Sequence, residues 1–469
     1  MVCMFLNTLT SYFFWLTIFA VKPNEMQRHF HIKVHLKATP SNLIPTSALD
    51  LLHHYEIQNI PAPMQTYTSV ITSLFSRPSS LARAQAWDIF THMRYVAHPI
   101  PDVLLYTLMI RACASPVTTR YSSEPEKALD LWTEMTVDQN ISPTIGAYNA
   151  VILACARSGT KTYVNEAFRL ARQMLDSHRD ASGYSPFRPD KKTFCALLEG
   201  AKRIGDLGRA RWILAEMVKG SPDGTNPIEA EVDEEVMMHV FHAYAAYDVP
   251  FLRSSAKFVS SAGTRAQATS PPTEERRVAS IAPNDSHSQS ELSADHDSDG
   301  AQMSFAHIPP QTRGEVIKEV EILLGHISKD RKGTPLVTSS SFLQSRFKGV
   351  ELTTRLLNSY LSVFYKHSPL ETAQDQFWKL FEDAGGLSRS PRTYVEALER
   401  CGNSRRGSER AVALDFADQL WPRWKAIEAD CNDSKPLNPR LIERAYVAMI
   451  RVLAVCVMFF FLLLLRPFD

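Results

Sequence analysis

The feature that most constrains this chain is an apolar pattern that recurs at intervals of about 40 residues. An aromatic residue opens an apolar segment four times, at Tyr67, Tyr106, Tyr148 and Phe194. A second segment then carries alanine, bulky apolar residues three and four positions later and methionine seven positions later, beginning at Ala86, Ala128, Ala167 and Ala210, except that the unit of Ala167 has Ala171 in the second bulky position. These offsets share one face of an α-helix. Each unit is therefore predicted to be a pair of helices.

The turns between units agree with this prediction. Pro101-Asp102, Pro143-Thr144 and Pro189-Asp190 each precede an opening aromatic segment. Proline ends the preceding segment, and aspartate or threonine can cap the next helix. A single helical pair cannot bury its own apolar face, whereas stacked pairs can. The sequence predicts an all-α fold, an α-solenoid.

The chain divides by composition into five parts. Residues 1–49 read as a hydrophobic or targeting segment, and 50–250 as the main array, whose fifth unit begins near Glu234. Residues 251–314 are rich in Ser, Pro, Asp and His, and we expect a disordered insert there because they cannot bury enough apolar surface. Residues 315–453 read as a second, degenerate array, and 454–469 as an apolar tail. About seven units result, four of them clear.

The two apolar ends leave several readings open. Residues 2–21 carry no charge and are long enough to span a bilayer. They are read as a signal anchor, as part of an organelle-import segment or as an artefact of gene prediction. The apolar stretch 452–465 is short for a span, and is read as a truncated or mis-spliced terminus.

Composition and motifs restrict the chemistry. The net charge is +1, from 51 basic and 50 acidic residues, which excludes a polycation and an acidic tail. The seven cysteines are scattered without any CxxC pair, which argues against a zinc module and a disulfide framework. Phosphate-loop, HExxH and GxSxG motifs are absent from the sequence. We therefore expect no enzyme, no cofactor and no metal, even at the adjacent His53 and His54.

The four clear units resemble pentatricopeptide repeats. The features that carry the resemblance are Tyr148-Asn149 at the start of a unit, the Pro-Asp pairs at unit ends, and Ala-x-x-Leu-Trp-x-x-Met from Ala128 to Met135. The pattern of the tetratricopeptide repeat cannot be laid onto these units. The units are longer than the family's, with the extra residues in loops. In this they are similar to fungal and animal mitochondrial members.

The resemblance implies binding of single-stranded RNA, with each unit addressing one base through two side chains. In this family the two side chains, here called readers, are the residue after the opening aromatic and the last residue of the unit. The pairs are Thr68 with Asp102, Thr107 with Thr144, Asn149 with Asp190, and Cys195 with Asp233. By the family's code, Thr with Asp implies guanine and Asn with Asp implies uracil, whereas the other two pairs are uninformative.

Two further expectations concern the rest of the RNA. The apolar residue before each reader, or one from the neighbouring unit, would sandwich the base. Basic residues near the ends of first helices would form a phosphate-binding stripe, the alternative being a plain solvated surface. These are Arg77, Arg83, Arg111, Arg157, Lys161, Lys202 and Arg203.

The expected setting follows from the resemblance alone. It is the mitochondrial matrix, or the inner membrane, and the processing, stability, splicing or translation of a mitochondrial transcript or ribosomal RNA. One alternative is a protein-interaction scaffold, such as a component associated with mitochondrial ribosome proteins. A second is a membrane-anchored adaptor that contacts the membrane through residues 2–21.

Overall fold

The computed structural model describes residues 22–115, 123–176, 185, 187–219, 232–250, 309–332, 347–404, 409–434 and 437–464. Within these ranges the regular structure consists of seventeen α-helices, α2–α18, and one π-helical turn, η1. The predicted all-α fold class is confirmed.

The helices alternate between two sets. The first helix of each unit is α2 (Glu25–Ala38), α4 (Met64–Phe75), α6 (Val103–Cys113), α8 (Ile145–Ala156), α10 (Lys191–Ile204), α12 (Glu234–Ala246), α14 (Thr354–His367), α16 (Pro391–Gly402) or α18 (Pro439–Leu464). The second helices are α3 (Thr46–Ile57), α5 (Ser80–Val96), α7 (Pro125–Thr133) continued by η1 (Glu134–Asp138), α9 (Lys161–Asp176), α11 (Leu207–Lys219), α13 (Arg313–Lys332), α15 (Leu370–Asp383) and α17 (Glu409–Ser434). From α4 to α16 each first helix packs against its own second helix and against the next first helix.

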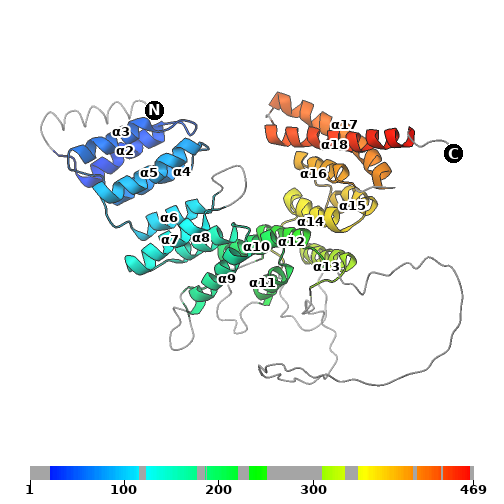
Figure 1. Cartoon of the computed structure of the whole chain (residues 1–469), viewed down its shortest axis with the longest axis horizontal. Coiled ribbons are helices and arrows are strands. Elements are labelled where there is room, and N and C mark those ends of the chain that lie inside the picture. The colour runs from blue at the N-terminus through cyan, green and yellow to red at the C-terminus, as the bar shows by residue number, and fades with distance from the viewer. Residues whose placement is uncertain are drawn as a thin grey trace, which may run out of the picture.

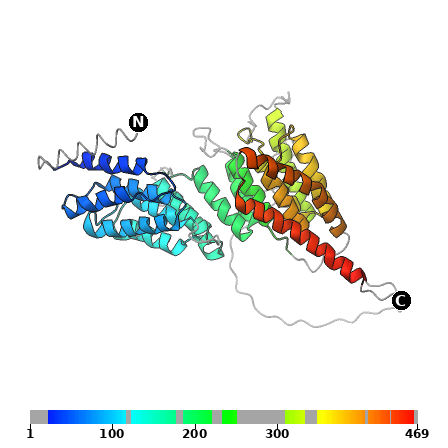
Figure 2. The ribbon, with the colours of Figure 1, turned by 90° about the horizontal axis from the view of Figure 1, so that it is seen from above.

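This packing makes a solenoid rather than a closed bundle. Figure 1 shows the pairs as an open arc with the N- and C-terminal pairs at its two ends and α9, α11 and α13 on the outer side of α8, α10 and α12. After a turn of 90° (Figure 2) the N-terminal pairs and the C-terminal pairs lie at opposite ends of the long axis, with the green helices between them. The predicted α-solenoid is therefore confirmed.

The repeated apolar positions form the core between the helices. The opening aromatics Tyr67, Tyr106 and Tyr148 are at most 2% exposed. Every alanine that starts the second-helix pattern is fully buried, and so is each of the first three methionines that end it. Alanine allows two helices to approach closely, while methionine seven residues later fills the space between them. The seven-residue pattern therefore defines the buried face of each second helix.

The array extends beyond the boundaries that composition indicated. It begins before residue 50, because α2 and the start of α3 lie within 22–49, and α2 packs onto both α3 and α4. It also continues past residue 453, because α18 ends at Leu464. Residues 251–308 separate α12 from its own second helix α13, so the compositional insert interrupts a unit. The predicted disorder of that insert, and the proposed anchor at 2–21, lie outside the described residues.

No helix in the described part of the chain combines the length and the apolarity that crossing a bilayer requires.

Neighbouring units are also joined through the carbonyl ends of their first helices. The last carbonyls of a helix have no partner within it. The Arg157 guanidinium donates to the Ala114 carbonyl at 3.1 Å, and Arg203 donates to the Arg157 carbonyl at 3.0 Å. Arg77 donates to the carbonyl of Leu43, in the loop between α2 and α3, at 2.5 Å. A cation at this end also complements the helix dipole.

A second link between units is a buried tyrosine bound to a carboxylate of a second helix. Tyr106 donates to Glu134 at 2.8 Å, and Glu134 also pairs with Arg94 of α5. Tyr244 donates to Glu319 at 2.8 Å, and Arg211 of α11 meets the same carboxylate at 3.0 Å. In both cases the arginine comes from the preceding second helix. Each of these carboxylates is partly buried, and it is both hydrogen-bonded and paired with a cation.

We expect Arg157→Met to lower the free energy of unfolding by about 1–2 kcal/mol, because it removes a charged donor and leaves the Ala114 carbonyl unsatisfied. The measurement is the urea midpoint of the full chain. Arg172→Met is the matched control, since the Arg172 side chain is 86% exposed on α9 and should change stability by less than about 0.5 kcal/mol. Equal midpoints for the two variants would contradict this role of Arg157.

Candidate nucleic-acid interface

The sequence-predicted readers occupy one register of the fold. Each first member is the fifth residue of a first helix, counted from the first residue of α4, α6, α8 and α10. Each second member is the N-cap residue of the next first helix, namely Asp102, Thr144, Asp190 and Asp233. The fifth residue of one first helix and the N-cap residue of the next first helix therefore lie at the junction of two units. We call the fifth residues Thr68, Thr107, Asn149, Cys195, Met238 and Asn358 the reader row.

The structure brings one predicted pair into direct contact. Asn149 Nδ2 donates to Asp190 Oδ1 at 2.9 Å, and Thr193 Oγ1 donates to Asn149 Oδ1 at 2.6 Å. Asp190 and Thr193 form a capping box at the start of α10, with Thr193 N donating to Asp190 Oδ1 at 2.8 Å. The cap thus holds both side chains and joins α8 to α10.

The same arrangement recurs at a pair that sequence reasoning missed. Asn358 is the fifth residue of α14, and Ser390 is the N-cap of α16. Asn358 Nδ2 donates to Ser390 Oγ at 3.4 Å, and Thr393 Oγ1 donates to Asn358 Oδ1 at 2.8 Å. The pattern search depended on an aromatic in the fourth position, where α14 has Leu357. An Asn five positions after an N-cap would have been the usable signal.

Two other predicted pairs bond within their own helices. Thr68 Oγ1 donates to Met64 O at 3.2 Å, and Thr107 Oγ1 donates to Val103 O at 2.6 Å. Asp102 caps α6 through Leu105 N at 2.8 Å, and Thr144 caps α8 through Ala147 N at 3.2 Å. These residues have the ordinary roles of helix caps and back-bonded threonines.

The fourth pair differs again. Asp233 caps α12 and forms an ion pair with Lys191. Burial, and then the negative charges of Glu235 and Asp233, raise the pKa of the Cys195 thiol to about 12. Cys195 therefore stays protonated at neutral pH and offers only a weak donor.

The expected base sandwich is wrong for the residue before each reader. Tyr67, Tyr106, Tyr148 and Phe194 are buried between helices and cannot stack on a base. Three residues before each reader, on the same helical face, the chain has Gln65, Leu104, Gly146, Lys192, Glu235 and Arg355. All six are exposed, and Leu104 is the one large apolar side chain among them.

The expected phosphate stripe is also wrong for most of its members. Arg77, Arg157 and Arg203 are bound to backbone carbonyls, and Arg83 reaches Ser115 O at 3.5 Å. Lys202 is paired with Glu199 at 2.5 Å. Arg111 and Lys161 are exposed.

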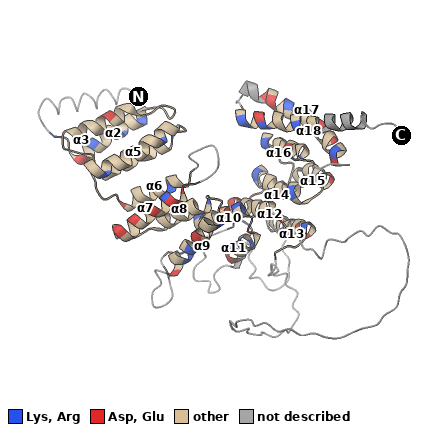
Figure 3. Ribbon diagram, viewed as in Figure 1, with Lys and Arg blue, Asp and Glu red and all other residues tan. Residues whose placement is uncertain are grey.

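Other basic residues lie in the register of the interface. The second residue of each of the last three first helices is an arginine, and all three are exposed: Arg355, Arg392 and Arg440. A second residue shares its helical face with the fifth, three positions later. Figure 3 shows basic and acidic residues interspersed along the rest of the array. A basic row in this register is therefore a feature of the C-terminal units.

A charged cluster lies where α10 packs against α12. Glu199 accepts from Lys202 and from Arg203 Nε at 2.7 Å, and its Oε2 lies 3.4 Å from His239 Nδ1. Burial opposes ionisation of Glu199, but these cations outweigh it and lower its pKa to about 2. Burial, and then Lys202, lower the pKa of both His239 and His242 to about 4. The carboxylate is thus charged and the imidazoles are neutral at pH 7.

Two sets of side chains in the described ranges bring metal-ligating atoms within 4.8 Å of one another. One set is Cys195, Glu235 and His239, between α10 and α12. The other is His53, Glu56 and His92, on α3 and α5. The structure thus brings His53, which the sequence left without a role, close to two possible ligands.

The architecture and the junction contacts define a helical-repeat protein of the α-solenoid class. No protein-family model and no curated protein sequence matches the chain. Among solved structures it is similar to the pentatricopeptide repeat protein PPR10 in complex with an 18-nt psaJ RNA element, at 14% identity and a TM-score of 0.31. A PPR10 variant with three cysteines changed to serine, with the same RNA element, gives the same values.

Each match covers 97% of this chain and 61% of PPR10, so the chain spans about three fifths of that protein's length. The roles of individual residues are assigned from this chain's own contacts.

The neutral imidazoles of α12 predict an acid-sensitive fold. Below pH 6.5 the unfolded chain protonates His239 and His242, whereas the folded chain does so only near pH 4. The unfolded state then binds more protons, so stability falls as the pH falls. Between pH 7.5 and pH 5 we expect each of these two histidines to contribute a loss of about 2 kcal/mol in urea unfolding.

The double variant His239→Gln/His242→Gln should lose part of this pH dependence, because burial also lowers the pKa of His31 to about 4 and lowers the pKa of His29, His35 and His367. His54→Gln, at an exposed position of α3, is the control and should keep it. Glu199 does not contribute in this window, because its stabilisation is lost only below about pH 4.5. A double variant with the parent's full pH slope would contradict the assignment.

Proposed function

We propose that this protein binds single-stranded RNA along the reader row, with Asn149–Asp190 and Asn358–Ser390 contacting bases. The observation that carries the proposal is the hydrogen bond from Asn149 to Asp190 across two units. It joins the residue after a buried aromatic to the cap of the next unit, as expected of a pair that reads one base.

The hydrogen-bonding capacity of this pair supports the proposal. Asn149 Nδ2 uses one of its two hydrogens on Asp190, and the other remains for a ligand. Asp190 Oδ1 accepts from Asn149 and Thr193, whereas Oδ2 remains for a ligand. The pair thus offers one donor and one acceptor side by side. A uracil edge presents a carbonyl acceptor next to its N–H donor, so the family's assignment of uracil fits this chemistry.

The other predicted pairs offer fewer free hydrogen-bonding groups to a base. The threonine hydroxyls of Thr68 and Thr107 already donate to the backbone and can accept from a base. We propose that Thr68 with Asp102 contributes a contact to guanine, as the family's code implies. The pairs Thr107 with Thr144 and Cys195 with Asp233 do not distinguish between bases, and contribute only to the shape of the surface that the RNA contacts.

Phosphate binding is assigned to the arginines in the register of the interface. Arg355 and Arg392 lie three residues before the fifth residue of their helices and are exposed. Arg392 pairs with Glu396 four residues later, at 2.6 Å, and remains 63% exposed. An exposed ion pair of this kind contributes little free energy, so the arginine can leave it and bind a phosphate instead.

The biological setting is proposed from the resemblance in sequence. We place the protein in the mitochondrion, in the matrix or at the inner membrane, acting on the processing, stability, splicing or translation of a transcript or of ribosomal RNA. We propose a binding protein without catalytic activity, because its sequence contains none of the catalytic motifs that we sought.

One observation favours a second function, the binding of a protein. Val447, Ile450 and Leu453 on α18 are 40%, 62% and 47% exposed. Offsets of three residues place them on one side of the last described helix. A scaffold that binds a partner, such as a mitochondrial ribosomal protein, would use such a surface. This function predicts binding that responds little to salt.

The readers are tested with Asn149→Ala and Asn358→Ala, which leave both N-caps in place. Binding of a random single-stranded RNA pool, followed by sequencing of the bound fraction, should give the parent a base preference at two positions. Each variant should lose the preference at one position and about tenfold in affinity for the parent's selected RNA.

Asn165→Ala is the matched control, because Asn165 is an exposed asparagine on the second helix α9. It should bind and select RNA as the parent does. Variants of Asn149 and Asn358 that select the parent's sequences with the parent's affinity would disprove the proposed base contacts. No selection by the parent would refute RNA reading altogether.

The phosphate contacts are tested with Arg355→Gln/Arg392→Gln. For single strands, each lost phosphate contact lowers the slope of log affinity against log salt by about 0.7, so the double variant should lose about 1.4. Arg172→Gln/Lys379→Gln removes two exposed cations from second helices and should keep the parent's slope. The measurement is fluorescence anisotropy with a labelled RNA at several salt concentrations, and equal slopes for both double variants would contradict the assignment.

A further inference from the structure

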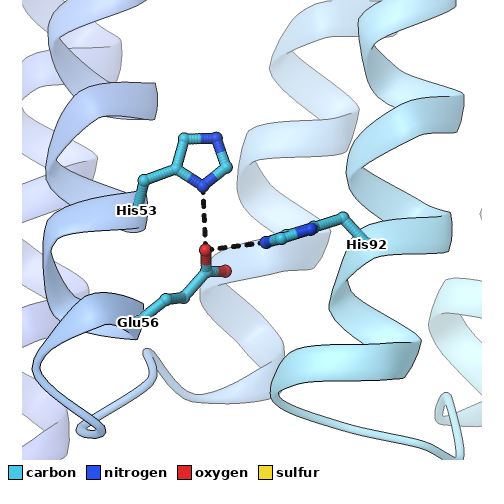
Figure 4. Close-up of side chains that lie close together, drawn as sticks. All are labelled: His53, Glu56 and His92. Atoms are coloured by element: carbon cyan, nitrogen blue, oxygen red, sulfur yellow. Dashed lines mark hydrogen bonds and ion pairs between the residues drawn. The ribbon is translucent and has the colours of Figure 1, made fainter.

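A cluster of imidazoles and a carboxylate lies at the N-terminal end of the array, away from the reader row. His53 and Glu56 belong to the second helix α3, and His92 belongs to α5. His53 Nδ1 lies 2.8 Å and His92 Nε2 lies 3.0 Å from the same oxygen, Glu56 Oε2. Figure 4 shows both rings pointing at this carboxylate from two different helices. Three potential ligands thus converge on one point between two units.

The cluster is a variant of the tyrosine–carboxylate links elsewhere in the array. Tyr67 donates to Glu56 Oε1 at 2.5 Å, as Tyr106 does to Glu134 and Tyr244 to Glu319. The other two carboxylates each pair with an arginine. At Glu56, two imidazoles take the arginine's place. A guanidinium carries a permanent charge and cannot bind a metal, whereas imidazole can be neutral and is the commonest metal ligand.

The positions of the atoms suit a small metal ion. A tetrahedral ion with bonds of about 2.0–2.1 Å separates its ligand atoms by about 3.3 Å. The two N···O distances are shorter than this by a few tenths of an ångström, so small rotations would admit the ion. Glu56 has one oxygen facing the imidazoles, and Tyr67 holds the other. Such a hydrogen bond from behind orients a ligating carboxylate.

Access from solvent is also present. The side chain of Glu56 is 4% exposed, whereas those of His53 and His92 are 49% and 42% exposed. An ion at this point would therefore have the protein on one side and solvent on the other. A water molecule can complete its coordination.

We propose that His53, Glu56 and His92 bind one divalent transition-metal ion, with Zn²⁺ the preferred ion and water in the fourth position. Two imidazoles and a carboxylate are ligands that zinc accepts and that Mg²⁺ and Ca²⁺ do not favour. The ion joins α3 to α5, and so joins two consecutive units. It supplies the positive charge that arginine supplies at Glu134 and Glu319. This site does not depend on the proposed RNA binding.

The test uses the full chain, stripped with a chelator and titrated with Zn²⁺ by calorimetry and with Co²⁺ by visible absorption. We expect one ion per chain at this site and a rise in the thermal midpoint on its addition. His53→Gln/His92→Gln keeps polar, exposed side chains and should lower the affinity at least a hundredfold and abolish the rise in the midpoint. Tyr67→Phe removes only the buried hydroxyl and should weaken binding about tenfold.

Two controls separate this site from other sources of binding. His54→Gln changes an exposed neighbouring histidine and should bind as the parent does. Cys195→Ser removes a ligand of the other cluster, whose thiolate would add a charge-transfer band to the Co²⁺ spectrum. Binding that survives His53→Gln/His92→Gln, or that is lost in Cys195→Ser instead, would overturn the proposal. Unchanged circular dichroism without metal establishes that the variants are folded.

Discussion

The structure depends on how the first helix of each unit is placed by its N-cap. A side chain four positions after the cap is buried and meets a second helix, as Tyr106 meets Glu134 of η1 and Tyr148 meets Trp132 of α7. The next side chain is rotated by about 100° and lies at the edge of the core, partly buried at Asn149 and 7% exposed at Asn358. Burial of the fourth residue therefore fixes the direction of the fifth. Since the cap of the following helix lies beside that fifth residue, one local interaction sets both the packing of the solenoid and the geometry of the reader row.

The ends of the first helices explain why this protein has no basic stripe where one was expected. A stacked helix buries its carbonyl end against the next unit, where water cannot satisfy it. Arg157 and Arg203 fill this need for α6 and α8, and His367 donates to Tyr244 O of α12 at 2.9 Å. These three side chains stabilise the contacts between units. Phosphate contacts must then come from the other end of the helices, where Arg355 and Arg392 lie.

The helical pairs and their buried faces could be predicted because they follow from short-range periodicity. Ala128 and Met135 are fully buried, as their seven-residue offset indicates. The Asn149–Asp190 contact could be predicted only through a family resemblance, since it joins residues 41 positions apart. Asn358 was missed because its helix has leucine instead of an aromatic in the fourth position. The role of Arg157 could not be predicted at all, because its acceptor is a backbone carbonyl, which has no signature in the sequence.

The carboxylates that accept from a tyrosine connect stability with ligand binding. Glu134 and Glu319 are partly buried, and a tyrosine hydroxyl and an arginine meet each of them. At Glu56 the hydroxyl is retained, but the described ion-pair partners are two histidines. Hydrogen bonds from Tyr67, His53 and His92 outweigh burial and lower the pKa of Glu56, so the carboxylate is charged at neutral pH. Among the described contacts no arginine meets Glu56 as one meets Glu134 and Glu319, and a cation bound by His53, Glu56 and His92 would supply the balancing charge.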